Sequence, residues 1–155
     1  MNTLARAPAS AAGKREIRLE QLPGHLFRRL HQLAVARFTA DMASLGLTPI
    51  QWSALVTTLQ RPGLDQITLS REIYIDTSTI AGVLDRLESR GLLRRQASPQ
   101  DRRVRLLYVT EEGEALLKDA NAAVLDTQEW LMEPLTPADR ALFTELTLRV
   151  LKRHE

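Results

Sequence analysis

The 155-residue chain contains no cysteine. This absence excludes disulfides, thiolate zinc sites, cysteine nucleophiles and redox sensing by cysteine within the chain. Histidine is almost as scarce, and His25, His31 and His154 are too few and too scattered in sequence to indicate a metal cluster. We therefore expect no metal centre and no cofactor.

Long apolar segments are also missing. No run reaches eighteen apolar residues, so the sequence predicts no membrane span. The N-terminal segment is small, polar and basic and lacks the apolar centre of a secretory signal. We expect residues 1–19 to form a flexible arm of a cytoplasmic protein.

The sequence lacks the common enzyme signatures. It has no Gly-x-Ser-x-Gly, no glycine-rich phosphate loop and no His/Glu set at metal-binding spacing, so we expect no enzyme. What is present is an ordinary globular composition, 44% apolar and 26% charged, at a length that suits one domain.

Charge is distributed unevenly along the chain. Residues 1–110 carry 16 Lys/Arg against 9 Asp/Glu, whereas residues 111–155 carry 5 against 10. Six arginines lie within residues 90–105, together with a single acid, Asp101. Such a basic stretch favours a surface that binds a polyanion, although a solvated charged hairpin explains it equally well.

Hydrophobic spacing and capping residues predict helices at both ends of the chain. An apolar arc of helical period runs over residues 21–45, and its length indicates that part of it contacts another subunit. A Thr-Pro-x-Gln capping box begins the next helix at Thr48. Thr110 is expected to cap a long helix, and Thr136 a last one. That last helix carries, on one face, Leu142, Leu146 and Val150.

The middle of the chain has the outline of a helix-turn-helix. Thr68 is expected to cap a short helix over residues 69–74, and Asp76 a second helix over residues 77–90. Gly91 suits the position just past that helix. Only about two residues remain for the turn between the helices, which is typical of a helix-turn-helix.

A basic β-hairpin follows. Residues 92–96 and 104–109 read as strands, separated by turn-forming residues. The sequence therefore predicts a mainly α fold in which residues 47–110 form a winged helix-turn-helix with a two-stranded wing. Residues 20–46 and 111–155 would form a helical dimerisation region.

The helix over residues 77–90 has one apolar and one polar face. Its expected core face comprises Ile80, Val83, Leu84 and Leu87. The candidates for DNA contact on the other side and in the first turn are Thr77, Ser78, Thr79, Gly82 and Arg86. Small residues allow close approach to the major groove, and an arginine reads guanine edges. A plain solvent-exposed face is the alternative, but the adjoining basic hairpin favours DNA.

The expected wing supplies further cations. Arg94 would lie at its base and Arg102 or Arg103 at its tip, from which an arginine can enter a narrow minor groove. Asp101 can either pair with a neighbouring arginine and fix its direction, or cap the turn.

Four motifs stand in a characteristic order: Thr-Pro-Ile-Gln-Trp at 48–52, Thr-Ser-Thr-Ile at 77–80, Leu-Asp-Arg-Leu-Glu-Ser-Arg-Gly-Leu at 84–92, and Asp-Arg-Arg at 101–103 followed by Val-Thr-Glu-Glu-Gly at 109–113. In this order and spacing they closely resemble the MarR family of bacterial repressors. The resemblance covers about residues 20–153, and the last motif is its most specific part.

The resemblance implies a homodimer whose first and last helices interlock and whose winged helices bind one pseudo-palindromic operator of double-stranded DNA. By position it assigns the major groove to Ser78, Thr79, Gly82 and Arg86, and the wing contact to Arg102 and Arg103. Many members release DNA when a small, often aromatic and anionic, molecule binds between the dimer helices and the winged domain. The sequence also has a general similarity to members that control the catabolism of aromatic or pyridine carboxylic acids.

Three residues are candidates for binding such an effector: Arg29, His31 and Trp52. A cationic group against apolar walls near an indole can hold an aromatic carboxylate. The alternatives are structural, because His31 also suits a subunit interface and Trp52 a core. Arg37 and Asp41 are spaced to pair with each other on the first helix.

An architectural winged-helix protein without ligand response is the alternative function. It would share the basic hairpin but would bind random duplex as well as any selected site.

Overall fold

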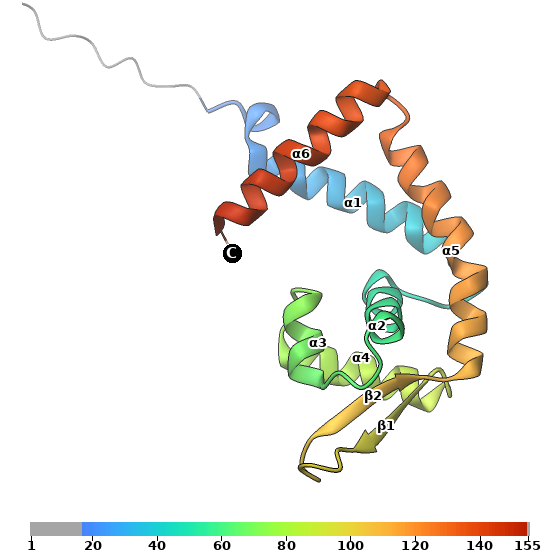
Figure 1. Ribbon diagram of the computed structural model, residues 1–155. Helices are drawn as coiled ribbons and strands as arrows, with labels where there is room; N and C mark the ends of the chain where they lie inside the picture. The colour runs from blue at the N-terminus through green and yellow to red at the C-terminus, as the bar shows by residue number, and fades with distance from the viewer. Residues whose placement is uncertain (1–16, 155) are drawn as a thin grey trace, which may run out of the picture.

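The computed structural model describes residues 17–154 and is mainly helical, with one two-stranded antiparallel hairpin (Figure 1). Its elements are η1 (Leu19–Gln21), α1 (Pro23–Asp41), α2 (Pro49–Gln60), α3 (Gln66–Glu72), α4 (Thr77–Ser89), β1 (Leu93–Ala97), β2 (Arg105–Val109), α5 (Glu111–Met132) and α6 (Pro137–His154). The predicted mainly α winged-helix fold is confirmed. Most of the predicted arm over residues 1–19 lies outside the described residues.

Local capping begins four helices where the sequence predicts, including α6, where the Thr136 hydroxyl accepts from the Asp139 backbone N–H at 3.3 Å. At α2, the Thr48 hydroxyl accepts from the Gln51 backbone N–H at 3.2 Å, and the Gln51 side chain accepts from the Thr48 N–H at 3.1 Å. Asp76 caps α4 by accepting two first-turn N–H groups at 3.1 and 2.8 Å, and the Thr110 hydroxyl caps α5. These bonds satisfy donors that have no partner within the helix.

The start of α3 differs from the prediction. Asp65 is the cap, since its Oδ1 accepts from the backbone N–H groups of Ile67 and Thr68 at 2.8 and 3.0 Å. The Thr68 hydroxyl itself donates to Asp65. Asp65 also forms an antiparallel bridge with Leu106, and this long-range pairing positions the helix start. The prediction that Thr68 caps a helix over residues 69–74 is therefore wrong.

The first helix is shorter at both ends than the predicted residues 21–45. After α1 the chain forms a turn in which Leu45 and Gly46 both donate backbone N–H groups to the Met42 carbonyl, at 3.0 and 2.9 Å. Gly46 adopts a φ of 60°, a left-handed conformation that ends helices and favours glycine. This turn carries the chain from α1 into α2.

The core lies mainly in the winged part of the molecule. As predicted, α4 buries Ile80, Val83, Leu84 and Leu87. In the hairpin, β1 pairs with β2 in a register that runs from Leu93↔Val109 to Ala97↔Arg105. Leu93 and Leu107 are buried and anchor the hairpin on the core.

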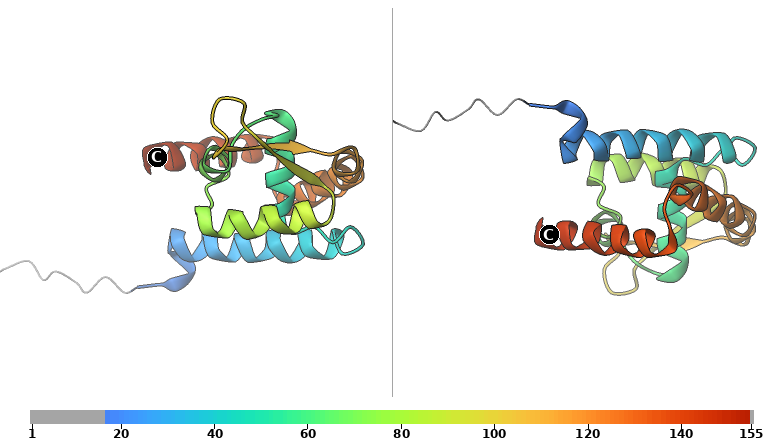
Figure 2. Two further views of the ribbon diagram at one scale, coloured as in Figure 1. Left: turned by 90° about the horizontal axis from the view of Figure 1, so that it is seen from below. Right: turned by 90° about the horizontal axis from the view of Figure 1, so that it is seen from above.

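Long α5 connects the two ends of the molecule. It begins at the wing and extends to α1 and α6, which lie at the end opposite the wing (Figure 1). Seen from below, α4 and the hairpin lie in front of α1 and α6 (Figure 2). None of the helices in residues 17–154 is both long and apolar enough to cross a membrane.

Candidate nucleic-acid interface and ligand cavity

The outward face of α4 carries small polar residues and one arginine among its exposed positions. The five predicted residues Thr77, Ser78, Thr79, Gly82 and Arg86 are all exposed, as are Asp85, Glu88 and Ser89 toward the end of the helix. Together with the start of α2, the last four of the five predicted residues line a groove of about 430 Å³. A Cβ placed on Gly82 would meet nothing within 4 Å, so the helix backbone is open to close approach. The structure thus brings the five predicted α4 residues onto one surface.

Asp76 orients the hydroxyls at the start of this surface. Ser78 Oγ donates to Asp76 Oδ1 at 2.5 Å, and Thr79 Oγ1 donates to Asp76 Oδ2 at 2.7 Å. These hydrogen bonds hold the pKa of the Asp76 carboxyl well below its usual range. Because both hydroxyl protons are used within the fold, the two oxygens present lone pairs that can accept hydrogen bonds from a ligand.

The six arginines of the basic stretch fall into two groups. Arg90 and Arg95 are engaged within the fold. Arg95 lies 2.6 Å from Asp85 and 3.6 Å from Glu88, and so ties the wing to α4. The second group comprises Arg94, Arg102, Arg103 and Arg105, which are exposed, as is Arg90.

The exposed wing arginines lie at the base and at the tip of the hairpin. The Arg94 guanidinium lies 4.8 Å from the centre of the Tyr108 ring, a cation–π arrangement at the base of the wing. Arg102 and Arg103 lie in the turn at the wing tip. Asp101 accepts a hydrogen bond from the Arg103 backbone N–H at 2.9 Å. Of the two roles predicted for Asp101, pairing with an arginine and capping the turn, the structure shows the capping role.

A small cavity of about 190 Å³ lies between α1, α2 and α5, with His31, Phe38, Trp52 and Thr127 among its walls. The Trp52 and Phe38 rings meet edge to face with centres 6.4 Å apart. The Trp52 indole N–H donates to the Asn121 side-chain oxygen at 3.4 Å. The structure therefore brings together two of the three predicted ligand residues.

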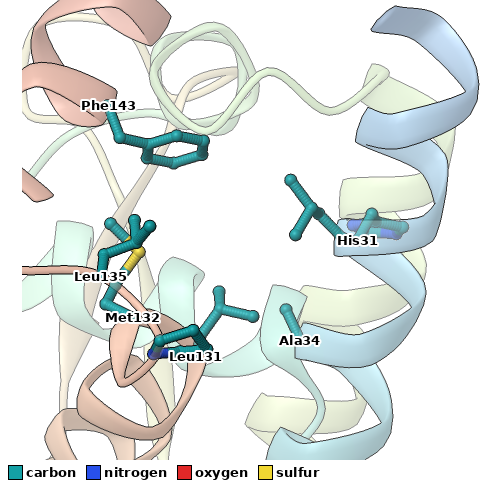
Figure 3. A pocket seen from close by; sticks show the side chains of 8 residues that line it. His31, Ala34, Leu131, Met132, Leu135 and Phe143 are labelled. Carbon is teal, nitrogen blue, oxygen red and sulfur yellow. The ribbon is translucent and has the colours of Figure 1, made fainter. Parts of the chain in front are cut away.

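The third predicted ligand residue, Arg29, is exposed on α1 and does not line this cavity. A larger cavity of about 440 Å³ lies between α1, the end of α5 and α6. Figure 3 shows His31 and Ala34 on one side of it and Met132, Leu135 and Phe143 on the other. Its walls are apolar apart from His31, which lines both cavities.

A polar network joins α1 to α5 beside the small cavity. Asp41 accepts hydrogen bonds from Arg37 and Thr127, each at 2.7 Å, which confirms the predicted Arg37–Asp41 pair. The Thr127 hydrogen bond, and then that of Arg37, lowers the pKa of the Asp41 carboxyl. The Arg37 guanidinium also lies 5.4 Å from the centre of the Trp130 ring. Sequence reasoning missed Thr127 and Trp130, because their partners are distant in the chain.

Comparison with known proteins identifies the family to which this fold belongs. Residues 47–104 match the model of the MarR family. Over 127 residues the chain is 30% identical to the transcriptional regulator HosA of Escherichia coli O111:H-, an alignment that covers 82% of this chain and 93% of HosA. The chain belongs to the MarR family.

Two solved structures extend this comparison. The MarR-family chain is similar to the PcaV transcriptional regulator from Streptomyces coelicolor in complex with its natural ligand (TM-score 0.82, 35% identity, 90% of this chain and 99% of PcaV). It is also similar to Bordetella bronchiseptica BpsR, whose DNA binding is regulated by 6-hydroxynicotinic acid (TM-score 0.83, 27% identity, 87% of this chain and 96% of BpsR). The protein is a MarR-family transcriptional regulator.

Proposed function

We propose that this protein is a cytoplasmic homodimeric repressor that binds an inverted-repeat operator and is released by a small aromatic carboxylate of the benzoate or pyridine type. The observation that carries the proposal is the exposed polar face of α4 beside the basic hairpin, at one end of the molecule (Figure 1). A helix with such a face fits the major groove, and the wing cations fit the flanking backbone and minor groove.

Each exposed residue has a role that follows from its chemistry. Thr77, Ser78 and Thr79 lie at the N-terminal end of α4, which enters the groove first in helix-turn-helix proteins. Gly82 lets the helix approach closely, and Arg86 offers a guanidinium to guanine. The wing contacts are assigned to Arg94, Arg102 and Arg103.

The dimer is supported by apolar residues that the fold leaves exposed at the other end. On α1 and α6 these include Leu26, Phe27, Leu33, Leu142, Leu146 and Val150. Large apolar side chains left exposed on α1 and α6 favour an interface there. A twofold axis through it would present two α4 helices to successive half-sites.

Selection of genomic fragments by the purified protein at about 150 mM salt tests the central proposal. We expect one inverted repeat with half-sites about one helical turn apart. Recovery of unrelated fragments in proportion to their length would instead support an architectural protein that does not read sequence.

Arginine variants test the residue assignments on the selected site. Arg86→Ala and Arg103→Ala should each weaken binding at least about fivefold, since a groove contact is worth roughly 1–3 kcal/mol. Arg28→Ala is the matched control, because it removes the same charge from an exposed position on the side of α1 away from Leu26 and Leu33. Full affinity in both test variants, measured by fluorescence anisotropy, would overturn the assignments.

The small cavity supports the effector class. Its volume of about 190 Å³ suits a single ring, with Trp52 available for stacking and His31 for a carboxylate. The similar protein BpsR responds to 6-hydroxynicotinic acid, a single-ring pyridine carboxylic acid. The proposal rests on His31 and Trp52 and not on Arg29, which lies outside this cavity.

Titration with 6-hydroxynicotinate and benzoate, monitored by tryptophan fluorescence and by operator release, tests this assignment. We expect binding by at least one of them and much weaker binding by cyclohexanecarboxylate, which lacks the aromatic face. His31→Ala and Trp52→Ala should raise the Kd about tenfold or more, since charge-assisted hydrogen bonds contribute roughly 1.5–3 kcal/mol. Arg29→Ala should leave the Kd unchanged. An equal effect of Arg29→Ala would move the site away from this cavity.

A further inference from the structure

The chain passes twice between the helical end of the molecule and the winged part. It leaves α1 through the turn that ends at Gly46, and it enters α5 directly after β2, at Thr110. These two crossovers are the covalent links that can set how α4 is positioned relative to α1.

Arg90, at the C-terminal cap of α4, binds the first crossover. Its Nη1 donates to the Gly46 carbonyl at 2.7 Å, and its Nη2 donates to the Leu45 carbonyl at 2.9 Å. The two acceptors lie 44 and 45 residues earlier in the chain. A planar guanidinium that donates from both terminal nitrogens restrains direction as well as distance, which a single ammonium cannot do.

The two residues after Arg90 bind the second crossover. The Thr110 hydroxyl donates to the Gly91 carbonyl at 2.6 Å, and the Thr110 N–H donates to the Leu92 carbonyl at 3.2 Å. The start of α5 is also closely packed there, since a Cβ on Gly113 would lie 2.2 Å from the Leu92 carbonyl oxygen. Residues 90–92 thus contact both crossovers at once.

From this geometry we infer that Arg90 is a positioning residue that sets which half-site spacing the regulator accepts. By holding the α1–α2 turn, it fixes the end of α4 relative to α1, and therefore the separation of the two α4 helices in a dimer. This role rests on the proposed function as a dimer on an inverted repeat. Arg90 is exposed, but both terminal nitrogens are directed at carbonyls of its own chain.

Operators with altered spacing test this role. One base pair added to or removed from the centre shifts a half-site by about 3.4 Å and turns it by roughly 35°. The wild-type protein should prefer one spacing strongly. In Arg90→Ala the ratio of Kd values between altered and natural spacing should fall about fivefold or more, and Arg90→Lys should restore part of it. Arg28→Ala, at an exposed position on the side of α1 away from Leu26 and Leu33, should keep the wild-type ratio.

The outcomes separate this role from the others. If Arg90→Ala weakens binding equally at every spacing, Arg90 is a phosphate contact and the inference is wrong. If the wild type and Arg90→Ala discriminate equally between spacings, the inference about Arg90 is wrong, while the proposed dimer on an inverted repeat stands. A wild-type protein that ignores spacing overturns the proposed function together with the inference.

A second measurement needs no DNA. Because the chain has no cysteine, Ile67→Cys provides a single labelling site on an exposed residue of the winged part. Spin labels at this site in a dimer should give a narrow distribution of distances in the wild-type background and a broader one with Arg90→Ala. Identical distributions, with both proteins folded by circular dichroism, would overturn the inference.

Discussion

The winged part and the helical end of this regulator differ in where they bury their apolar residues. Helix α4 buries four, Ile80, Val83, Leu84 and Leu87. Helix α1 buries only Phe38, and α6 has no buried residue among those that the structure describes. The winged part therefore holds most of the buried core, to which Phe38, Met42 and α5 also contribute, whereas α1 and α6 leave many apolar side chains exposed.

Polar contacts between distant residues occur at both ends of the molecule. Arg95 and Arg90 tie the winged part to itself and to the adjoining turn. At the helical end, Arg140 of α6 lies 2.6 Å from Glu129 of α5, and Thr127 of α5 donates to Asp41 of α1. The two ends therefore differ in apolar burial and not in polar pairing.

The largest expected effect is on the core of the winged part. Leu84→Ala should lower the free energy of unfolding by about 2–5 kcal/mol, because Leu84 is fully buried and its truncation leaves a cavity. Urea unfolding at a fixed protein concentration measures the loss. Ile67→Ala is the matched control, since Ile67 is 55% exposed in the same part of the molecule. Equal losses in the two variants would contradict the conclusion that the buried face of α4 contributes most to the stability of the winged part.

A substitution on α6 should have a smaller effect on folding stability than Leu84→Ala, but a large effect on dimerisation. Leu146 is 47% exposed, and Leu146→Glu would place two carboxylates in the proposed interface of a twofold dimer. The loss of apolar burial alone should weaken dimerisation by at least about 2 kcal/mol, or roughly thirtyfold. Sedimentation equilibrium measures this directly.

The control for that variant is Gln60→Glu, which adds the same charge at an exposed position at the end of α2 in the winged part. It should leave the dimer intact. Dissociation by both substitutions would mean that net charge, and not this apolar face, governs association.

Sequence predicted the features that depend on neighbours in the chain. The caps at Thr48, Asp76 and Thr110 and the buried face of α4 arise from residues within one or two helical turns, so their signals are local. Asp65 was missed as a cap although its hydrogen bonds to Ile67 and Thr68 are as local as those of the other caps. Only its bridge to Leu106 depends on the tertiary fold.

The arginines of residues 90–105 show the same limit within the candidate site. In sequence they form one basic stretch, and only the fold separates Arg90 and Arg95, which bind acceptors of the chain, from the other four. The same holds for the residues beside the small cavity, since Thr127 donates a hydrogen bond to Asp41, 86 positions earlier in the chain. Pairing between distant residues carries no local signal.

The smallest expected effect concerns the charge at the start of α4. Ser78 and Thr79 donate hydroxyl and backbone N–H groups to Asp76, and these bonds lower the pKa of its carboxyl. A carboxyl whose pKa is lower in the folded state contributes stability that is complete above its unfolded pKa of about 3.9. That contribution is lost as the pH falls toward the folded-state pKa.

Asp76→Asn isolates this charge, because asparagine is as good an N-cap as aspartate. At pH 7 the variant should unfold at a slightly lower temperature than the wild type, and the difference should shrink as the pH is lowered from about 5 to about 3. Asp76→Ala removes the cap as well and should be less stable than Asp76→Asn at pH 7. Thermal melts followed by circular dichroism measure all three proteins. If the difference in unfolding temperature between the wild type and Asp76→Asn does not change with pH, the charge of Asp76 does not contribute to stability. The buried face of α4 and the neutral cap would then stabilise the helix alone.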